Sequence, residues 1–153
     1  MAWALWATRG GLSTAVRTEG SGRFRFRMLE GIRILMLEDH ADTRHVYATA
    51  LRQHGAVVHE AGSAQVALIL LQLERPDLML LDIELPDADG YAFYEAVRRL
   101  SPEGGGQTPA VALTVRNTAT DRAESVKRGF RLHLVKPIDP DELCRILGGL
   151  MKL

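Results

Sequence analysis

The sequence has few of the features that mark secreted or membrane-spanning proteins. A single cysteine, Cys144, among 153 residues excludes an intramolecular disulfide and a zinc site built on several cysteines. The longest apolar run, Val66 to Leu71, falls far short of the ~18 residues needed to span a bilayer. We therefore expect a cytoplasmic protein without a membrane span.

An excess of charge of one sign is also lacking. The chain has 19 basic and 19 acidic residues. Residues 1–31 hold five arginines and two glutamates, which leaves 14 basic and 17 acidic residues for the rest of the chain. Because that larger part is slightly acidic, the composition argues against direct binding of nucleic acid.

The first part of the chain lacks any sustained helical or strand period. Residues 1–27 are rich in Gly, Ser, Thr and Arg, and two interpretations are open: a transit peptide or a disordered extension. Met28 directly precedes the first strand pattern and is an alternative start of translation. We expect a disordered N-terminal extension over residues 1–31 and one folded domain over residues 32–153.

From Ile32 onward, strand and helix patterns alternate. Short apolar runs predict five strands, at Ile32–Leu37, Ala56–Glu60, Leu78–Ile83, Pro109–Leu113 and Leu132–Val135. Capping residues predict where four helices begin, namely Asp42, Ser63, Thr118 and Asp139. The helix after Ser63 is expected to bury Val66, Leu70 and Leu73. Five strand–helix units of this kind predict an α/β fold with a doubly wound five-stranded parallel sheet.

Polar residues follow four of the predicted strands. Glu38 and Asp39 end the first, Asp82 the third, Thr114 the fourth and Lys136 the fifth. Ligands of such sheets bind beyond the carboxyl ends of the strands, so these side chains are expected to meet at one edge. Taken singly, each has a structural interpretation, as a helix cap or a turn residue. Their joint placement at strand ends favours a functional site.

The chemistry of this set points to phosphoryl transfer. Three neighbouring carboxylates need a cation, and oxygen ligands of this kind suit Mg²⁺. A carboxylate beside Mg²⁺ and a lysine is a plausible nucleophile toward phosphorus. The ammonium and hydroxyl groups would neutralise and position the phosphoryl oxygens.

Four motifs carry a resemblance to a known family. They are "ILMLEDHADTR" (34–44), "PDLMLLDIELPDADGY" (76–91), "PAVALTV" (109–115) and "HLVKPIDPDEL" (133–143). Residues 32–151 resemble the receiver domain of two-component response regulators, of the CheY-like, flavodoxin-like fold. The chain resembles the stand-alone type, because no output module follows Leu153.

The resemblance implies roles for individual residues. Asp82 would accept a phosphoryl group from a sensor histidine kinase or a histidine phosphotransfer protein. Asp39 and Asp82 would bind Mg²⁺ directly, Glu38 would reach the ion through water, and the backbone carbonyl of Glu84 would be a further ligand. Lys136 would bind the phosphoryl group, and the bond from it to the following proline would be cis.

Further implied roles concern the signal. Thr114 would be the switch hydroxyl, and His133 stands where the family often has an inward-swinging Tyr or Phe; it is either a switch residue or a partly exposed strand residue. Glu84 and Arg116 would flank the path of attacking water, as a pair or as solvated side chains. His40, directly after the acid pair, is either a metal ligand or a surface residue.

Two other functions remain open. Glu84, two residues after Asp82, would suit a Mg²⁺-dependent phosphatase with an aspartyl nucleophile. A docking module independent of phosphorylation is the third interpretation. As a receiver, the protein would act through contacts with an unknown downstream protein and would catalyse only its own phosphotransfer and dephosphorylation.

Overall fold

All five predicted strands of the domain are present and lie in one sheet. The computed structural model describes residues 15–16 and 25–152. Its elements in chain order are β1 (Ala15–Val16), β2 (Arg25–Phe26), β3 (Arg33–Leu37), α1 (Ala41–Gln53), β4 (Val57–Ala61), α2 (Ala64–Glu74), β5 (Leu78–Leu81), α3 (Gly90–Arg98), η1 (Pro102–Gly104), β6 (Ala110–Thr114), α4 (Ala119–Lys127), β7 (Leu132–Val135) and α5 (Pro140–Met151).

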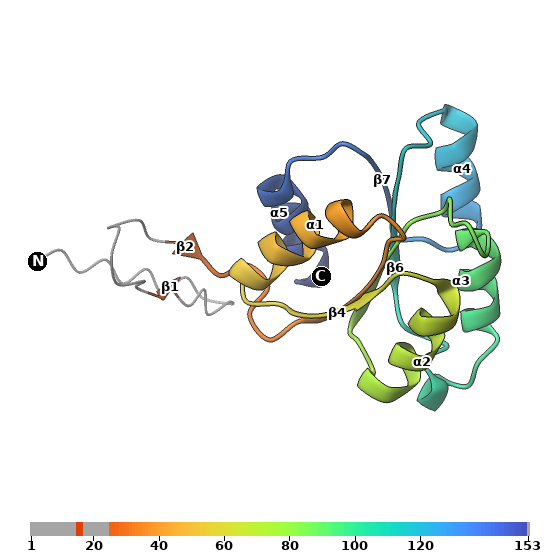
Figure 1. Ribbon diagram of the computed structural model, residues 1–153, viewed down its shortest axis with the longest axis horizontal. Coiled ribbons are helices and arrows are strands. Elements are labelled where there is room, and N and C mark those ends of the chain that lie inside the picture. The colour runs from red at the N-terminus through yellow and green to blue at the C-terminus, as the bar shows by residue number, and fades with distance from the viewer. Residues whose placement is uncertain (1–14, 17–24, 153) are drawn as a thin grey trace, which may run out of the picture.

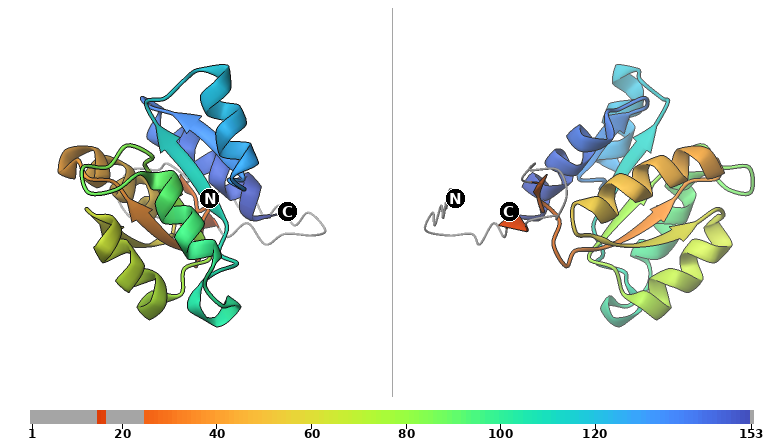
Figure 2. Two further views of the ribbon diagram at one scale, coloured as in Figure 1. Left: turned by 90° about the vertical axis from the view of Figure 1, so that its right-hand side faces the viewer. Right: turned by 60° about the vertical axis from the view of Figure 1, so that its left-hand side comes forward.

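The main sheet has the order β4-β3-β5-β6-β7, and every neighbouring pair is parallel. Helices α1 and α5 lie on one side of it and α2, α3 and α4 on the other (Figure 1). In the further views, α1 and α5 pack side by side (Figure 2). This doubly wound arrangement confirms the predicted α/β fold class, since short strands covered on both faces read as continuous apolar runs.

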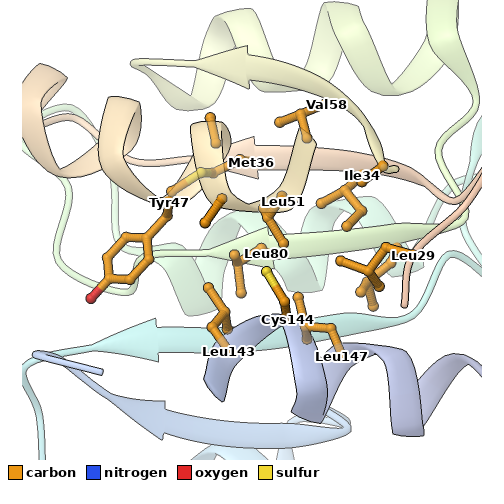
Figure 3. Packing of buried hydrophobic residues seen from close by; sticks show 14 of the residues in the cluster. Leu29, Ile34, Met36, Tyr47, Leu51, Val58, Leu80, Leu143, Cys144 and Leu147 are labelled. Atoms are coloured by element: carbon orange, nitrogen blue, oxygen red, sulfur yellow. The ribbon is translucent and has the colours of Figure 1, made fainter. Parts of the chain in front are cut away.

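Two apolar cores hold the layers together. The strands alternate their side chains between the two faces, so Ile34 and Met36 of β3 join α1 and α5 in the first core, while Leu35 and Leu37 face α2 and α3. Figure 3 shows the first core, in which Cys144 of α5 is fully buried. Burial raises the pKa of the Cys144 thiol to about 12, so the thiol stays protonated and acts as a small apolar side chain.

Helix α2 begins where predicted but buries a different face. The Ser63 hydroxyl accepts a hydrogen bond from the Val66 N–H, as expected of a cap. Ala67 and Leu71 are fully buried, whereas Val66 is 43% and Leu73 71% exposed. The prediction that Val66 and Leu73 are buried was therefore wrong. A helix that is apolar on nearly every side has no polar stripe to mark its outer face.

The other helix starts agree with the sequence, with one exception. Thr118 and Asp121 form a reciprocal capping box, and Asp139 accepts two backbone N–H groups at the start of α5. Asp42, predicted as a cap, lies inside the first turn of α1 instead. His40 takes the cap position, and its side chain makes no capping hydrogen bond.

The predicted disordered extension falls largely outside the described residues, which omit 1–14 and 17–24. Of that extension, the structure describes residues 15–16 and 25–31. They include β1 and β2, which pair in an antiparallel two-stranded sheet of their own.

One residue that lies before the predicted domain boundary, Leu29, packs into the first core. Leu29 is fully buried in the first core (Figure 3), and its N–H donates to the carbonyl of His54 at 2.9 Å. Burying a leucine side chain stabilises a fold by about 1.5–3 kcal/mol. Leu29 therefore packs with the first core although it precedes the predicted boundary between residues 31 and 32, and that boundary stays a prediction.

Candidate functional site

The predicted site residues meet at the carboxyl edge of the sheet. The chain leaves β3 toward β4 on one side and later returns to add β5 on the other, which makes the gap between β3 and β5 the topological switch point. Glu38 and Asp39 follow β3, and Asp82 follows β5, so the three acids flank this gap. Glu38 is 1% exposed and Asp82 5% exposed.

Lys136 joins the two buried acids. Its ammonium lies 2.7 Å from Glu38 Oε2 and 3.1 Å from Asp82 Oδ2. The lysine comes from the end of β7, two strands away from β5, and its side chain reaches back along the sheet edge. The peptide bond from Lys136 to Pro137 is cis, as the resemblance implied.

The electrostatics of the site follow from burial. Loss of solvation raises the pKa of Asp82, and the charge of Glu38 raises it further, while Lys136 opposes both. Burial on its own would lower the pKa of Lys136, but hydrogen bonding and attraction to Glu38 and Asp82 outweigh it and raise that pKa. The site thus holds its two buried acids with one cation between them.

The donor set fits a hard divalent cation. Asp39 Oδ1 is buried and has no hydrogen-bond partner in the part of the chain that the structure describes, an arrangement that is costly unless a cation binds there. Glu38, Asp39 and Asp82 supply carboxylate oxygens, which are the ligands that Mg²⁺ prefers. The residues present therefore fit a magnesium ion.

The loop after β5 holds Asp82 and Glu84 in place. The N–H of Glu84 donates to Asp82 Oδ1 at 3.1 Å, and that of Gly90 to the Ile83 carbonyl at 2.8 Å. A Cβ atom at Gly90 would overlap the carbonyl oxygen of Asp82, so only glycine permits this close approach. The Asp89 carboxylate then caps α3.

Glu84 and Arg116 form an ion pair between the loops that follow β5 and β6. Arg116 Nε lies 3.0 Å from Glu84 Oε1, so the strand-end loops of β5 and β6 are joined. Both residues line an open depression of about 240 Å³ together with Leu85 and Asp89. Because the Glu84 carboxylate is engaged by Arg116, it does not stand free next to Asp82 as a phosphatase acid would.

Thr114 and His133 are linked through the loop after β6. The Thr114 hydroxyl is fully buried and accepts the N–H of Arg116 at 3.3 Å. His133 Nε2 donates to the carbonyl of Arg116 at 2.8 Å, and its Nδ1 lies 2.7 Å from the hydroxyl of Ser125. Both ring nitrogens are thus engaged inside the domain.

Sequence reasoning missed two members of this network. Ser125 of α4 is fully buried, and its hydroxyl lies 2.8 Å from the hydroxyl of Tyr91 on α3. Tyr91 also donates to the carbonyl of Asp121 at 3.2 Å. A buried serine in a helix gives no signal of its own in the sequence, because its partner His133 is brought close only by the packing of α4 on β7.

A doubly wound parallel sheet with buried acids and a lysine at its switch point defines the class of this protein. It is an α/β domain whose buried acids, Glu38 and Asp82, are bridged by the Lys136 ammonium at the carboxyl edge of the sheet. The family model described as "Response regulator receiver domain" matches residues 34–148. The chain belongs to this family of two-component signalling domains, which are not metabolic enzymes.

Relatives in sequence support this assignment. A protein of Leptolyngbya boryana called "Uncharacterized 14.6 kDa protein in sodA1 3'region" is 39% identical over 114 residues, covering 74% of this chain and 86% of that protein. "Probable transcriptional regulator ycf27" of Cyanophora paradoxa is 32% identical over 120 residues, covering 78% of this chain but only 48% of the regulator. The match thus spans about half of that longer relative.

Solved structures show the same fold. The chemotaxis response regulator CheY4 of Vibrio cholerae superposes with a TM-score of 0.71 at 27% identity, covering 80% of this chain and 99% of that one. A putative response regulator of Chloroflexus aurantiacus gives a TM-score of 0.73 at 24% identity, which is similarity of fold alone. Among the described residues, no helix is both long and apolar enough to cross a bilayer.

Proposed function

We propose that this receiver domain accepts a phosphoryl group on Asp82 in a Mg²⁺-dependent reaction and passes the signal to a protein partner. The observation that carries the proposal is the bridge from Lys136 to Glu38 and Asp82, at 2.7 and 3.1 Å. Close to it in the chain, Asp39 Oδ1 is buried and has no hydrogen-bond partner among residues 15–16 and 25–152. A nucleophile, a cation and oxygen donors for a metal stand together at the switch point of the sheet.

Asp82 would act as the nucleophile. One of its carboxylate oxygens attacks the phosphorus of the donor, and an acyl phosphate forms as the bond from phosphorus to the leaving group breaks with its electron pair. When the donor is a phosphohistidine of a sensor kinase or of a phosphotransfer protein, the leaving group is an imidazole nitrogen. Lys136 would stay with the phosphoryl oxygens and neutralise their charge.

Four residues would hold the metal ion. Asp39 and Asp82 would bind through their carboxylates, Glu84 through its backbone carbonyl, and Glu38 through water. Bound Mg²⁺ would neutralise the negative charge that gathers when a phosphoryl group meets these acids. The loop turn at Gly90 supports this role, because it fixes the backbone of the Asp82–Glu84 segment.

The signal would leave the site through Thr114. A phosphoryl group on Asp82 offers new acceptor oxygens, and a move of the Thr114 hydroxyl toward them would break its hydrogen bond with the Arg116 N–H. Arg116 also holds His133 through its carbonyl, and His133 holds Ser125 of α4. Each such hydrogen bond contributes about 0.5–1.5 kcal/mol, enough to shift a two-state equilibrium at α4.

Intact mass measurement tests this function. Wild-type protein incubated with acetyl phosphate and Mg²⁺ should gain the mass of one phosphoryl group, and the gain should vanish with a chelator or in Asp82→Asn. Asp77→Asn is the matched control, because Asp77 is an exposed acid before β5, at the opposite end of that strand. A gain of mass in Asp82→Asn would refute the proposal.

The two alternative functions give other results. A phosphatase would release phosphate from small phosphoesters over many turnovers, and a docking module would bind its partner equally well as wild type and as Asp82→Asn. If the protein shows phosphatase turnover or phosphorylation-independent docking and takes up no phosphoryl group, the corresponding alternative replaces the proposed function.

A further inference from the structure

Three side chains that bind metals gather where the chain passes from β3 into α1. Among the described residues, Glu38, Asp39 and His40 form a set of three whose ligand atoms lie within 4.8 Å of one another. His40 Nδ1 is 3.3 Å from Glu38 Oε1 and 3.4 Å from Asp39 Oδ1. A nitrogen ligand beside two carboxylates is not part of the donor set that the proposed magnesium site uses.

These spacings are those of ligands around one small ion. Metal–ligand bonds of about 2.0–2.1 Å place neighbouring ligand atoms roughly 3.0 Å apart in an octahedron and roughly 3.4 Å apart in a tetrahedron. The two distances from His40 Nδ1 fall at the tetrahedral end of this range. The His40 ring nitrogen therefore already lies at ligand spacing from both acids.

The side chains are also available for binding. The His40 side chain is 74% exposed and makes no capping hydrogen bond, although it begins α1. Asp39 Oδ1 is buried and has no hydrogen-bond partner among the described residues, which favours a cation at this point, as it does for the proposed magnesium site. Glu38 binds Lys136 through Oε2, while its Oε1 accepts the backbone N–H of His40 at 3.2 Å and lies 3.3 Å from His40 Nδ1.

We propose that Glu38, Asp39 and His40 form a binding site for a borderline transition-metal ion such as Zn²⁺ or Co²⁺. Imidazole nitrogen favours these ions, whereas Mg²⁺ prefers oxygen ligands only. The site shares Glu38 and Asp39 with the proposed magnesium site, so one ion excludes the other. A transition metal would therefore hold the domain in a form that cannot bind Mg²⁺. The competition rests on the proposed function, but the site itself does not.

Isothermal titration of the full-length chain with Zn²⁺, without any phosphodonor, tests the site. The wild type should bind one Zn²⁺ per chain, and His40→Gln should weaken this affinity at least about tenfold, because one ligand is lost. The ratio of Zn²⁺ to Mg²⁺ affinity should fall by the same factor. His45→Gln is the matched control, since His45 is an exposed histidine of α1 outside the cluster and its loss should leave Zn²⁺ affinity unchanged.

The visible spectrum of bound Co²⁺ gives a second readout. The wild type should show the intense bands of tetrahedral nitrogen and oxygen coordination, and His40→Gln should lose them. Equal Zn²⁺ affinity and equal Co²⁺ spectra in wild type and His40→Gln would overturn the proposal, because His40 would then be only a hydrogen-bonding neighbour of Glu38.

A competition experiment separates this proposal from the proposed function. Addition of Zn²⁺ should raise the Mg²⁺ concentration needed for phosphoryl uptake from acetyl phosphate, and less so in His40→Gln. Zn²⁺ binding through His40 in a chain that takes up no phosphoryl group would refute the proposed function alone. Normal phosphoryl uptake with Zn²⁺ affinity unaffected by His40→Gln would refute the transition-metal site alone.

Discussion

Replacing Lys136 by methionine removes the one cation that lies between two buried acids. Glu38 is 1% exposed and Asp82 5% exposed, and both contact the Lys136 ammonium. Methionine keeps the length and the apolar stem of the side chain, so packing along the sheet edge should change little. The loss of charge is then the main perturbation, and in a chelator no metal ion compensates for it.

The magnitude depends on the burial of the pair. Removing one partner of a buried ion pair costs about 3–5 kcal/mol, because the other charge stays buried without compensation. The Lys136 side chain is 12% exposed, which lets some water reach the acids and favours a loss of about 3 kcal/mol. For a domain of this size, such a loss lowers the melting temperature by roughly 10 °C.

The loss should also depend on pH. Lys136 lowers the pKa of Asp82, so its removal raises that pKa further above its already raised value. A carboxyl group with a raised pKa in the folded state takes up a proton on folding, and stability therefore increases as pH falls through that pKa. The stability that Lys136→Met loses relative to wild type should therefore be smaller near pH 5 than near pH 7.5.

Urea unfolding of wild type, Lys136→Met and Lys127→Met in the presence of a chelator checks this. Lys127 is an exposed lysine at the end of α4, and its replacement should change the free energy of unfolding by less than about 0.5 kcal/mol. If Lys136→Met behaves like Lys127→Met, or loses the same stability at both pH values, the buried bridge is not what stabilises this edge of the sheet.

The same structure leads to three further predictions. Asp82→Asn should raise the melting temperature of the metal-free protein at pH 7.5, because burial raises the pKa of Asp82 and its ionised form destabilises the fold. The gain in melting temperature should disappear in acid, and a fluorimetric melt that shows no gain at pH 7.5 would contradict the prediction. Leu29→Ala should cost about 3 kcal/mol in urea unfolding, whereas a chain starting at Met28 should keep wild-type stability and phosphoryl uptake. Thr114→Ala should still take up phosphoryl on Asp82 but lack the NMR shift changes at His133; full changes in that variant would place the signal on another route.

The fold and the acid cluster were predictable because local sequence determines both. Strands covered on both faces read as unbroken apolar runs, and the residues directly after each strand lie at one edge of a parallel sheet. The meeting of Glu38, Asp82 and Lys136 therefore needed only the strand ends and their common direction. Their distances and the bridging position of the ammonium needed the structure.

Other features were not predictable, for reasons that differ. The outer face of α2 was misassigned because Val66 and Leu73 are as apolar as the buried Leu71, so burial was decided by the neighbouring sheet. The contact of His133 with Ser125 joins a strand to a helix through tertiary packing, which no spacing in the sequence encodes. Leu29 was missed because a single apolar residue before a strand carries no periodic signal.

The central claim is that Asp82 carries the phosphoryl group, and chemical location of that group tests it most directly. Hydride reduction of an acyl phosphate converts the phosphorylated aspartate into homoserine, which peptide mass spectrometry places at one position. After incubation with acetyl phosphate and Mg²⁺, we expect homoserine at Asp82 and at no other acid, and none after incubation with a chelator. Homoserine at Asp39, or an unchanged Asp82 in a chain that has gained the mass of a phosphoryl group, would contradict the central claim.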